Sequence, residues 1–526
     1  MSKKVLVTEK LSDEGIEVLR NRGYEVDVRL DMTEADLLAA VPEYDALIVR
    51  SATQVTQAVL DNAERLKVIG RAGVTTDNID IVAATEAGVI VCNAPTSNIV
   101  STAEHTMALM LAAAGCVPQA NASMKQGKWE RNKFVGTELF EKTLAIFGLG
   151  RIGGLVAERA RAFGMNLIGY DPYCRPERAE ALGVQLFGSI EEILPLADFI
   201  TVHMPKTPDT INMFGPDEFA AMKDGVILVN TARGGIYNVK SLADFIAAGK
   251  IGAAAIDMYE VEPCLDSPLH EFDNVILTPR IGAATREAQR RAAVQIAEYV
   301  AAGLEGSLVP TALNMTPVAP EAASKVGPYV PACQMMGRIL AQLSTSLPHT
   351  LCITAAGSLV GTDMSMLVAG ALSGLLSYKS DSVVTPVNAE AVANRHGIST
   401  TTAFEYDAHE YASMVRIEAD GFEVSAMLSG PAATPRIVSL LGYRLDIAPG
   451  LTSLVFEYPD AAGRMGIIGT ILGEAGINIT TMQIGEKASE ECVLVYMNIE
   501  GEITDDVIAR LHEAIGDLKN LWVIKL

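Results

Sequence analysis

The segment Thr143-Leu-Ala-Ile-Phe147-Gly148-Leu-Gly150-Arg151-Ile152-Gly153 joins a short apolar run to a glycine pattern of the form GxGxxG. The apolar run predicts a buried strand, and the residues from Arg151 onward predict a helix. The first glycine permits a tight turn, the second lets the backbone approach a pyrophosphate, and the third lets the helix pack closely on the strand. We therefore expect Gly148, Gly150, Arg151, Ile152 and Gly153 to hold a dinucleotide at a helix N-terminus.

A second predicted strand, Asn166–Tyr170, ends directly before Asp171, 18 residues after Gly153. A carboxylate at this distance can accept a hydrogen bond from a ribose 2′-hydroxyl and repels a 2′-phosphate. The sequence therefore predicts NAD rather than NADP as the cofactor. Arg175 lies nearby and weakens this preference.

The first 300 residues alternate β-branched apolar runs with amphipathic helical stretches. The predicted strands include Lys4–Thr8, Ala46–Arg50, Lys67–Gly70, Thr143–Phe147, Asn166–Tyr170, Phe199–Met204, Val226–Asn230 and Val275–Thr278. Continuous apolar runs bounded by turn residues are typical of strands buried on both faces of a parallel sheet. The pattern predicts an α/β fold with two Rossmann-like, doubly wound lobes.

The pattern changes after residue 303, where residues 303–315 predict a linker. The following region, to about residue 448, is rich in Ala, Ser, Thr and Met and mixes helices with strands. The last segment has the order β-α-β-β-α-β, which predicts a ferredoxin-like domain. Its predicted strands are Ser453–Tyr458, Ile477–Ile484, Glu491–Ile499 and Leu521–Ile524, and its predicted helices are Gly466–Glu474 and Thr504–Ile515.

The composition limits the possible functions. The chain has 526 residues and a net charge of -23, from 41 Lys and Arg against 64 Asp and Glu; at about 150 residues per domain it is long enough for three or four domains. This acidic balance argues against nucleic acid as a partner but allows a small anionic substrate at a local cluster of arginines. The apolar stretches are shorter than the ~18–20 residues of a membrane span, so we expect no membrane partner. Seven scattered cysteines without a CxxC pair, together with the lack of a signal peptide, predict a cytoplasmic protein without a metal site.

Three further segments follow the carboxyl ends of predicted strands, where open α/β sheets place their ligands. They are Asn230-Thr231-Ala232-Arg233-Gly-Gly, Asp257-Met-Tyr-Glu-Val-Glu262-Pro and Thr278-Pro-Arg280-Ile-Gly282-Ala283. The planar guanidinium group of Arg233 suits bidentate binding of a carboxylate. These segments therefore predict a site for a small acid beside the dinucleotide.

Residues 1–315 resemble the D-isomer-specific 2-hydroxyacid dehydrogenases. The resemblance rests on the segments above and on Val49-Arg50-Ser51-Ala-Thr, Gly70-Arg71-Ala-Gly73, Asn93-Ala-Pro-Thr-Ser-Asn98, Ala103-Glu-His-Thr-Met and Gly127-Lys-Trp-Glu-Arg131. The whole chain resembles the long-form members that use NAD to oxidise D-3-phosphoglycerate to 3-phosphohydroxypyruvate, the first step of the phosphorylated route to serine. The resemblance implies a substrate-binding lobe at 1–99 plus 286–315, an NAD-binding domain at 100–285, an α+β intervening domain at 316–449 and an ACT domain at 450–526. It also implies a homo-oligomer of two or four subunits.

The resemblance also implies roles for individual residues. Arg233 would bind the substrate carboxylate and the C2 oxygen, and Asp257 would hold the nicotinamide carboxamide. Thr231, Ala232, Gly282 and Ala283 would complete the cofactor site, and Arg50, Ser51, Arg71, Asn98 and Arg131 would bind the phosphorylated substrate. In the ACT domain, Tyr458, Asp460 and Asn478 would bind serine as a feedback effector.

One residue departs from the family pattern. Where the family has Thr-Pro-His, with the histidine oriented by the glutamate as the base, this chain has Thr278-Pro-Arg280. Arginine is protonated near pH 7 and cannot accept the hydroxyl proton. The predicted catalytic set is therefore Arg233, Glu262 and Arg280, with the role of Arg280 open.

Several interpretations follow from this departure. Glu262 or a water could accept the proton in a slow enzyme, or His105 or His203 could replace the missing base. Alternatively, the chain could be a different 2-hydroxyacid dehydrogenase or a 2-oxoacid reductase, in which a cationic Arg280 polarises a keto oxygen. A fourth interpretation is a weakly catalytic protein that binds NAD and amino acids as a regulator.

Overall fold

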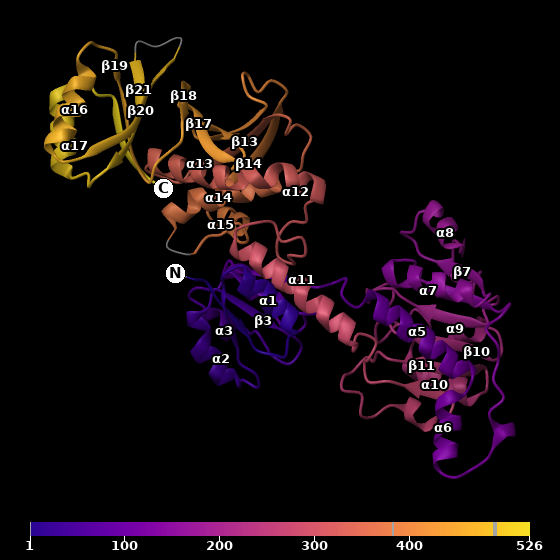
Figure 1. Cartoon of the computed structure of the whole chain (residues 1–526). Helices are drawn as coiled ribbons and strands as arrows, with labels where there is room; N and C mark the ends of the chain where they lie inside the picture. Colours follow the sequence, from indigo (N-terminus) through magenta and orange to yellow (C-terminus); the bar gives the residue numbers. More distant parts are fainter. Residues whose placement is uncertain (1, 381–382, 488–491) are drawn as a thin grey trace.

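A computed structural model describes residues 2–380, 383–487 and 492–526. Within them the strands form four sheets, of five, seven, six and four strands. In Figure 1 the lobe that contains the N-terminus (indigo) lies between the lobe of the seven-stranded sheet (purple and magenta) and the C-terminal part (orange and yellow).

The first sheet is parallel, with the strand order β2-β1-β3-β4-β5. Its strands are β1 (Lys4–Val7), β2 (Glu25–Val28), β3 (Ala46–Val49), β4 (Val68–Arg71) and β5 (Ile90–Asn93). Its helices are α1 (Asp13–Asn21), α2 (Glu34–Ala40), α3 (Gln57–Asp61), α4 (Ile81–Glu86) and α11 (Arg286–Leu304), with the 3₁₀ turn η1 (Val41–Glu43). All four residues of β3 are buried, as its unbroken apolar run predicts, whereas β2 is a half-exposed edge strand without such a run. The helix α11 follows β12, an edge strand of the second sheet, and packs on α1 and β4 of the first lobe.

The second sheet is also parallel, with the order β12-β11-β10-β9-β6-β7-β8. Its strands are β6 (Thr143–Phe147), β7 (Asn166–Tyr170), β8 (Gln185–Leu186), β9 (Phe199–Val202), β10 (Val226–Asn230), β11 (Ile251–Ile256) and β12 (Val275–Leu277). The chain runs outward in both directions from β6, which lies between β7 and β9. This reversal marks the place where dinucleotides bind in such sheets. Two parallel α/β sheets confirm the fold class predicted for the first 300 residues.

The helices of this second lobe are α5 (Ile99–Ala114), α6 (Val117–Lys125), α7 (Arg151–Ala162), α8 (Pro176–Leu182), α9 (Pro216–Ala221) and α10 (Val239–Ala247), with the 3₁₀ turns η2 (Arg131–Lys133) and η3 (Pro268–Glu271). Within the described ranges, no helix by itself has the length and apolar character needed to cross a membrane. Only α5 and α6 taken together, with a 64° bend between them, meet that criterion by length and composition.

The third sheet combines antiparallel and parallel strands in the order β14-β13-β15-β16-β17-β18. Its strands are β13 (Thr350–Gly357), β14 (Ser399–Glu405), β15 (Ser413–Ala419), β16 (Phe422–Ser429), β17 (Thr434–Leu440) and β18 (Tyr443–Ile447). Its helices are α12 (Pro320–Val326), α13 (Val330–Leu343), α14 (Ser365–Lys379) and α15 (Ala389–Arg395), with the 3₁₀ turn η4 (Gly327–Tyr329). The helices α13 and α14 cross closely, and Gly337 permits this because it has no side chain. A Cβ atom at Gly337 would lie 2.2 Å from the Ala371 carbonyl oxygen.

The fourth sheet is antiparallel, with the order β20-β21-β19-β22. Its elements are β19 (Thr452–Pro459), α16 (Arg464–Glu474), β20 (Asn478–Glu486), β21 (Cys492–Glu500), α17 (Asp505–Ile515) and β22 (Asn520–Lys525), in the predicted order β-α-β-β-α-β. The predicted third strand began at Glu491, which lies outside the described residues. One face of this sheet carries α16 and α17, while Val455, Tyr496 and Ile524 join the core around α13.

Two side chains, those of Thr385 and Asn388, bind the region of the third sheet to the first lobe. Thr385 Oγ1 donates to the Gly88 carbonyl oxygen at 2.8 Å, and Asn388 Nδ2 donates to the Glu86 carbonyl oxygen at 3.1 Å. Asn388 is almost completely buried in this contact. These contacts join the region of the third sheet to the turn between α4 and β5 of the first lobe.

The close packing of α1 on α11 predicts a stability effect. A Cβ atom at Gly15 would lie 2.7 Å from the Ala293 carbonyl oxygen of α11, so the helices must separate in Gly15→Ala. We expect overpacking to lower the free energy of unfolding by about 1–3 kcal/mol, measured by urea unfolding. The control is Gly188→Ala, where a Cβ atom would meet nothing within 4 Å. Equal effects at the two positions would contradict the packing explanation.

Candidate active site

A cleft of about 940 Å³ lies at the carboxyl ends of the first two sheets. It takes side chains from both lobes, so neither lobe forms it alone. The predicted site residues that line it are Arg50, Ser51, Arg71, Asn98, Ile152, Thr231, Ala232, Arg233, Asp257, Arg280, Gly282 and Ala283. The structure thus brings together residues that are up to 233 positions apart in the sequence.

The glycine loop between β6 and α7 has the geometry that a dinucleotide requires. Gly148 has φ +94°, a conformation that favours glycine, and a Cβ atom at Gly153 would lie 1.9 Å from the Gly148 carbonyl oxygen. A Cβ atom at Gly150 would meet nothing within 4 Å, so the space above the N-terminus of α7 is open. The first and third glycines are required by the fold, and the second leaves room for a pyrophosphate.

Asp171, directly after β7, is bonded to the glycine loop. Its Oδ2 accepts a hydrogen bond from Leu149 N at 2.8 Å, and its Oδ1 accepts one from Tyr173 N at 2.9 Å. Each carboxylate oxygen keeps a further lone pair for a ribose hydroxyl. The arginine that reaches this loop is Arg178 rather than Arg175, because Arg178 donates to the carbonyl oxygens of Leu149 and Gly150. No sequence motif points to Arg178.

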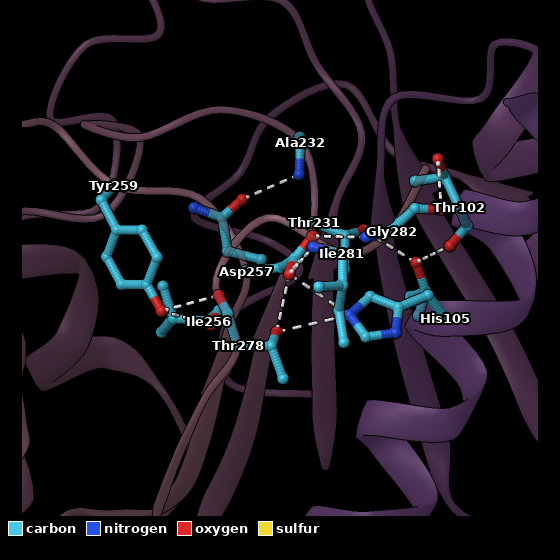
Figure 2. A network of polar contacts seen from close by, with 12 residues as sticks. Thr102, His105, Thr231, Ala232, Ile256, Asp257, Tyr259, Thr278, Ile281 and Gly282 are labelled. Atoms are coloured by element: carbon cyan, nitrogen blue, oxygen red, sulfur yellow. Dashed lines mark hydrogen bonds and ion pairs between the residues drawn. The ribbon is translucent and has the colours of Figure 1, made fainter. Parts of the chain in front are cut away.

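Asp257 is the centre of a polar network shown in Figure 2. Its Oδ1 accepts hydrogen bonds from Thr278 Oγ1 at 2.7 Å and Ile281 N at 2.8 Å, and its Oδ2 accepts one from Gly282 N at 3.0 Å. Burial by itself would raise the pKa of this carboxyl group, but the hydrogen bonds from His105, Thr278 and the backbone lower it below its usual value. Asp257 is therefore a fixed anion at the edge of the cleft.

Neither histidine considered from the sequence is placed as a base for the substrate. His105 lies on α5 behind Asp257, with its Nε2 3.4 Å from both Asp257 Oδ1 and Thr278 Oγ1. His203 lines the cleft, but complete burial lowers its pKa to about 3. It is thus neutral and a weak base at neutral pH.

The cleft concentrates positive charge in an acidic chain. Burial, Arg50 and Arg280 lower the pKa of Arg71, while burial and Arg280 lower that of Arg233. Both side chains stay protonated, because even a lowered arginine pKa lies far above neutrality. Lys10, Arg286 and Arg290 also line the cleft and were not predicted from the sequence, which contains no motif for them. Such a site attracts an anion despite the net charge of -23.

Arg280 is joined to Glu262, the glutamate predicted to accompany the catalytic base. Arg280 Nη1 lies 2.6 Å from Glu262 Oε2, and Glu262 Oε1 accepts a hydrogen bond from Tyr259 N at 3.3 Å. Arg280 lines the cleft, whereas Glu262 is not among the residues that line it. Arg280 has φ +56°, a left-handed conformation that is uncommon for a residue other than glycine. The pair therefore presents a fixed cation, not a base, to the cleft.

The remaining predicted residues lie elsewhere. Gly148, Gly150, Arg151, Gly153 and Asp171 form the glycine loop and its partner beside the cleft. The structure does not bring Arg131 to the cleft, since it lies on the exposed turn η2. Tyr458 is buried in the core of the fourth sheet, and its hydroxyl group donates to Met465 Sδ at 3.2 Å. Asp460 and Asn478 are exposed, after β19 and at the first residue of β20.

The cleft has features that bound ligands, a dinucleotide among them, would satisfy. His203 Nδ1 and Arg71 Nε are buried and find no hydrogen-bond partner in the described part of the chain, and buried polar groups ordinarily have one. The open N-terminus of α7, the ribose-binding geometry of Asp171 and the anionic Asp257 complete a donor and acceptor set that fits NAD. No cluster of three metal-ligating side chains occurs in the described ranges.

Comparisons with known proteins agree with this geometry. The family model "D-isomer specific 2-hydroxyacid dehydrogenase, NAD binding domain" matches residues 107–282, and "D-3-phosphoglycerate dehydrogenase intervening domain" matches residues 325–440. Proteins named D-3-phosphoglycerate dehydrogenase are similar over the full length. The one from Mycobacterium tuberculosis is 41% identical over 99% of both chains, and the one from Methanocaldococcus jannaschii is 40% identical over 99% of this chain and 100% of that one.

Solved structures resemble the first two lobes. The TT0316 protein of Thermus thermophilus is 35% identical with a TM-score of 0.54, and covers 59% of this chain and 99% of its own. A glyoxylate reductase from Paecilomyes thermophila is 27% identical with a TM-score of 0.53, and covers 59% of this chain and 98% of its own.

The two parallel sheets, the glycine loop and the arginine-lined cleft define an NAD-dependent oxidoreductase of the D-isomer-specific 2-hydroxyacid dehydrogenase class. Within that class, the chain belongs to the D-3-phosphoglycerate dehydrogenase family, whose members it matches from end to end.

The position of Asp171 predicts its effect on cofactor choice. In Asp171→Ala we expect the Kd for NADH, measured by fluorescence titration, to rise about tenfold through loss of a charge-assisted hydrogen bond. Affinity for NADPH should fall less, because the carboxylate no longer repels the 2′-phosphate. The control is Asp198→Ala, since Asp198 accepts a hydrogen bond from Thr143 N at the opposite end of β6. An equal loss of NADH affinity in Asp198→Ala would show that the change in Asp171→Ala comes from lower stability of the lobe and not from a lost contact with the ribose.

Proposed function

We propose that this chain oxidises the C2 hydroxyl group of D-3-phosphoglycerate with NAD⁺ and produces 3-phosphohydroxypyruvate, the first step of the phosphorylated route to serine. The observation that carries the proposal is a group of arginines that line one cleft, among which we assign Arg50, Arg71, Arg233 and Arg280 to the substrate. A substrate with a carboxylate at one end and a phosphate at the other needs cations at both ends. Each charge-assisted hydrogen bond contributes about 1.5–3 kcal/mol, so two or three of them distinguish this substrate from an unphosphorylated hydroxy acid.

The two lobes divide the substrate between them. Arg233, from the second lobe, binds the carboxylate and the C2 oxygen, and Arg50, Ser51, Arg71 and Asn98 hold the phosphate end from the other side of the cleft. The predicted role of Arg131 in binding the substrate has no support from the structure, because Arg131 lies on η2 and does not line the cleft.

The cofactor site lies on the second lobe. Gly150 and the N-terminus of α7 receive the pyrophosphate, and Asp171 receives the ribose. Asp257 holds the carboxamide, with Thr231, Ala232, Gly282 and Ala283 alongside. When bound, the nicotinamide ring supplies the acceptor for the hydride that leaves C2. The chain itself must orient the substrate and stabilise its oxygen.

Arg280 takes a role different from that of the family's histidine. Its guanidinium group, oriented by Glu262, donates to the C2 oxygen and stabilises the negative charge that develops there. Because Arg280 cannot accept a proton and His203 is a weak base, the hydroxyl proton passes to water or hydroxide in the cleft. The same fixed cation polarises the keto oxygen in the reverse direction. Reduction of the 2-oxoacid is therefore a second activity of this site.

This mechanism predicts a distinctive pH dependence. If the proton goes to solvent, kcat/KM for oxidation should rise with pH through neutrality, up to about tenfold per pH unit where hydroxide is the acceptor. In Arg280→His, the rate should instead level off above a pKa near 6.5, because neutral imidazole is then the base. General base catalysis should also raise the rate at pH 7 by on the order of 10²-fold. Initial rates of NADH formation with D-3-phosphoglycerate between pH 6 and 9 measure both profiles.

The control for this experiment is Arg280→Lys, which keeps the cation but supplies no imidazole. A plateau near pH 6.5 in the native chain would contradict the mechanism and indicate another base. A native chain that binds NADH and phosphoglycerate without turnover would favour the regulatory interpretation.

We further infer that residues 450–526 form an ACT domain that binds serine. The order β-α-β-β-α-β and the exposure of Asp460 and Asn478 support this assignment. Asp460 would pair with the ammonium group, and Asn478 would bind the carboxylate. Tyr458 does not support the predicted role, because its side chain is buried and its hydroxyl group contacts Met465.

We also infer the domain division implied by the family and a homo-oligomer of two or four subunits. The packing of α11 on α1 supports the assignment of residues 286–315 to the first lobe. Large apolar side chains on α6 and the following loop are more than half exposed, as in an uncovered interface; they are Val117, Trp129, Val135 and Phe140.

The effector assignment predicts separable effects. In Asp460→Ala and Asn478→Ala, we expect the serine concentration for half-inhibition to rise at least tenfold, with kcat and KM unchanged in its absence. Asp505→Ala, at the N-terminus of α17, is the matched control and should leave serine inhibition intact. Initial rates measured over a serine titration give the result. If serine does not inhibit the native chain, the effector proposal is wrong.

A further inference from the structure

The loop Arg50–Thr53 follows β3 and carries two of the side chains assigned to the phosphate end of the substrate. Its backbone N–H groups are bound by a single carboxylate, that of Glu9. Glu9 Oε1 accepts from Arg50 N at 2.8 Å, Ala52 N at 3.2 Å and Thr53 N at 3.0 Å. Three of the four amides in this loop are therefore used to hold the loop in place.

Two carbonyl groups of the same loop are bound by a different side chain, that of Asn78. Asn78 Nδ2 donates to the Arg50 carbonyl oxygen at 2.9 Å and to the Thr53 carbonyl oxygen at 2.6 Å. Asn78 is 9% exposed and precedes α4. The hydroxyl groups of Thr8 and Thr53 lie 2.8 Å apart and add a third contact. The loop has no regular secondary structure, so these side chains determine its conformation.

Electrostatics give a second reason for an anion at this position. Arg50 lowers the pKa of the partly buried Arg71, while Glu9 acts in the opposite sense. The Glu9 carboxylate therefore offsets part of the repulsion between the two guanidinium groups. Neither Glu9 nor Asn78 lines the cleft, so both act from behind the residues that do.

We propose that Glu9 and Asn78 are positioning residues that clamp the backbone of the Arg50–Thr53 loop, and thereby direct Arg50 and Ser51 at the anionic end of the substrate. The proposal rests on the proposed function for the identity of that substrate. The clamp itself follows from the hydrogen bonds.

The test compares Glu9→Ala, Glu9→Gln, Asn78→Ala and the double alanine variant with the native full-length chain. Three quantities are measured: KM and kcat for D-3-phosphoglycerate, the Kd for NADH, and hydrogen exchange of the peptide that contains residues 50–53. The matched control is Asp45→Ala. Asp45 accepts a hydrogen bond from Lys4 N at 2.8 Å, so it is also a lobe carboxylate that binds a backbone amide, but at the opposite end of the sheet.

In Glu9→Ala we expect KM to rise at least tenfold, with kcat changed much less and the Kd for NADH unchanged. Exchange of residues 50–53 should become faster. Glu9→Gln should have a smaller effect, because the amide oxygen can still accept from the three N–H groups. In the double variant, the increase in KM, expressed as a free energy, should be smaller than the sum of the increases in the two single variants, because both side chains hold the same loop. In Asp45→Ala, stability should fall without a change in KM.

Unchanged exchange of residues 50–53 in Glu9→Ala would overturn the clamp. Faster exchange with an unchanged KM would overturn its role in substrate binding. If the native chain neither binds nor oxidises D-3-phosphoglycerate, the proposed function fails. In that case inorganic phosphate serves as the probe, and equal phosphate affinity in the native chain and Glu9→Ala would overturn the proposal independently.

Discussion

Mutual repulsion among guanidinium groups is the constraint on which the rest of the site depends. Arg50 and Arg71 come from the first lobe, and Arg233 and Arg280 come from the second. Burial and neighbouring arginines lower the pKa of Arg71 and Arg233, so bringing these cations together costs free energy. Under the proposed function, a substrate that carries both a carboxylate and a phosphate offsets that cost when it binds. The charge that makes the site unfavourable when empty is thus the charge that makes it selective.

The protein offsets this repulsion with anions placed behind the cations. Glu262 contacts Arg280, and Glu9 lies behind Arg50 and Arg71. Asp257 is a different kind of anion, because its hydrogen bonds come from Thr278 and the backbone amides of Ile281 and Gly282. It lines the cleft and contacts His105 rather than an arginine. In the proposed function, the cations bind the substrate and this separately held anion serves the cofactor.

Arginine at position 280, where the family pattern has histidine, changes the proton chemistry that the site can perform. Arg280 contacts Glu262 and lines the cleft, so an ion pair orients the side chain at this position. Under the proposed mechanism, the site keeps electrostatic stabilisation of the C2 oxygen and has no internal base. By that mechanism proton transfer depends on solvent, so the rate of oxidation continues to rise with pH where an imidazole base would give a plateau.

The sequence alone determined the parallel α/β class, the glycine loop and the cofactor, because these depend on local patterns: apolar runs, glycine spacing and a carboxylate at a set distance. It also identified most of the cleft residues through the family motifs. Only the tertiary structure decided that Arg178 supports the glycine loop, that Tyr458 is buried, and that Glu9 and Asn78 hold the Arg50 loop. These contacts join residues from separate elements. A short motif carries no information about which distant side chain will reach a given backbone group, since that depends on how the elements pack.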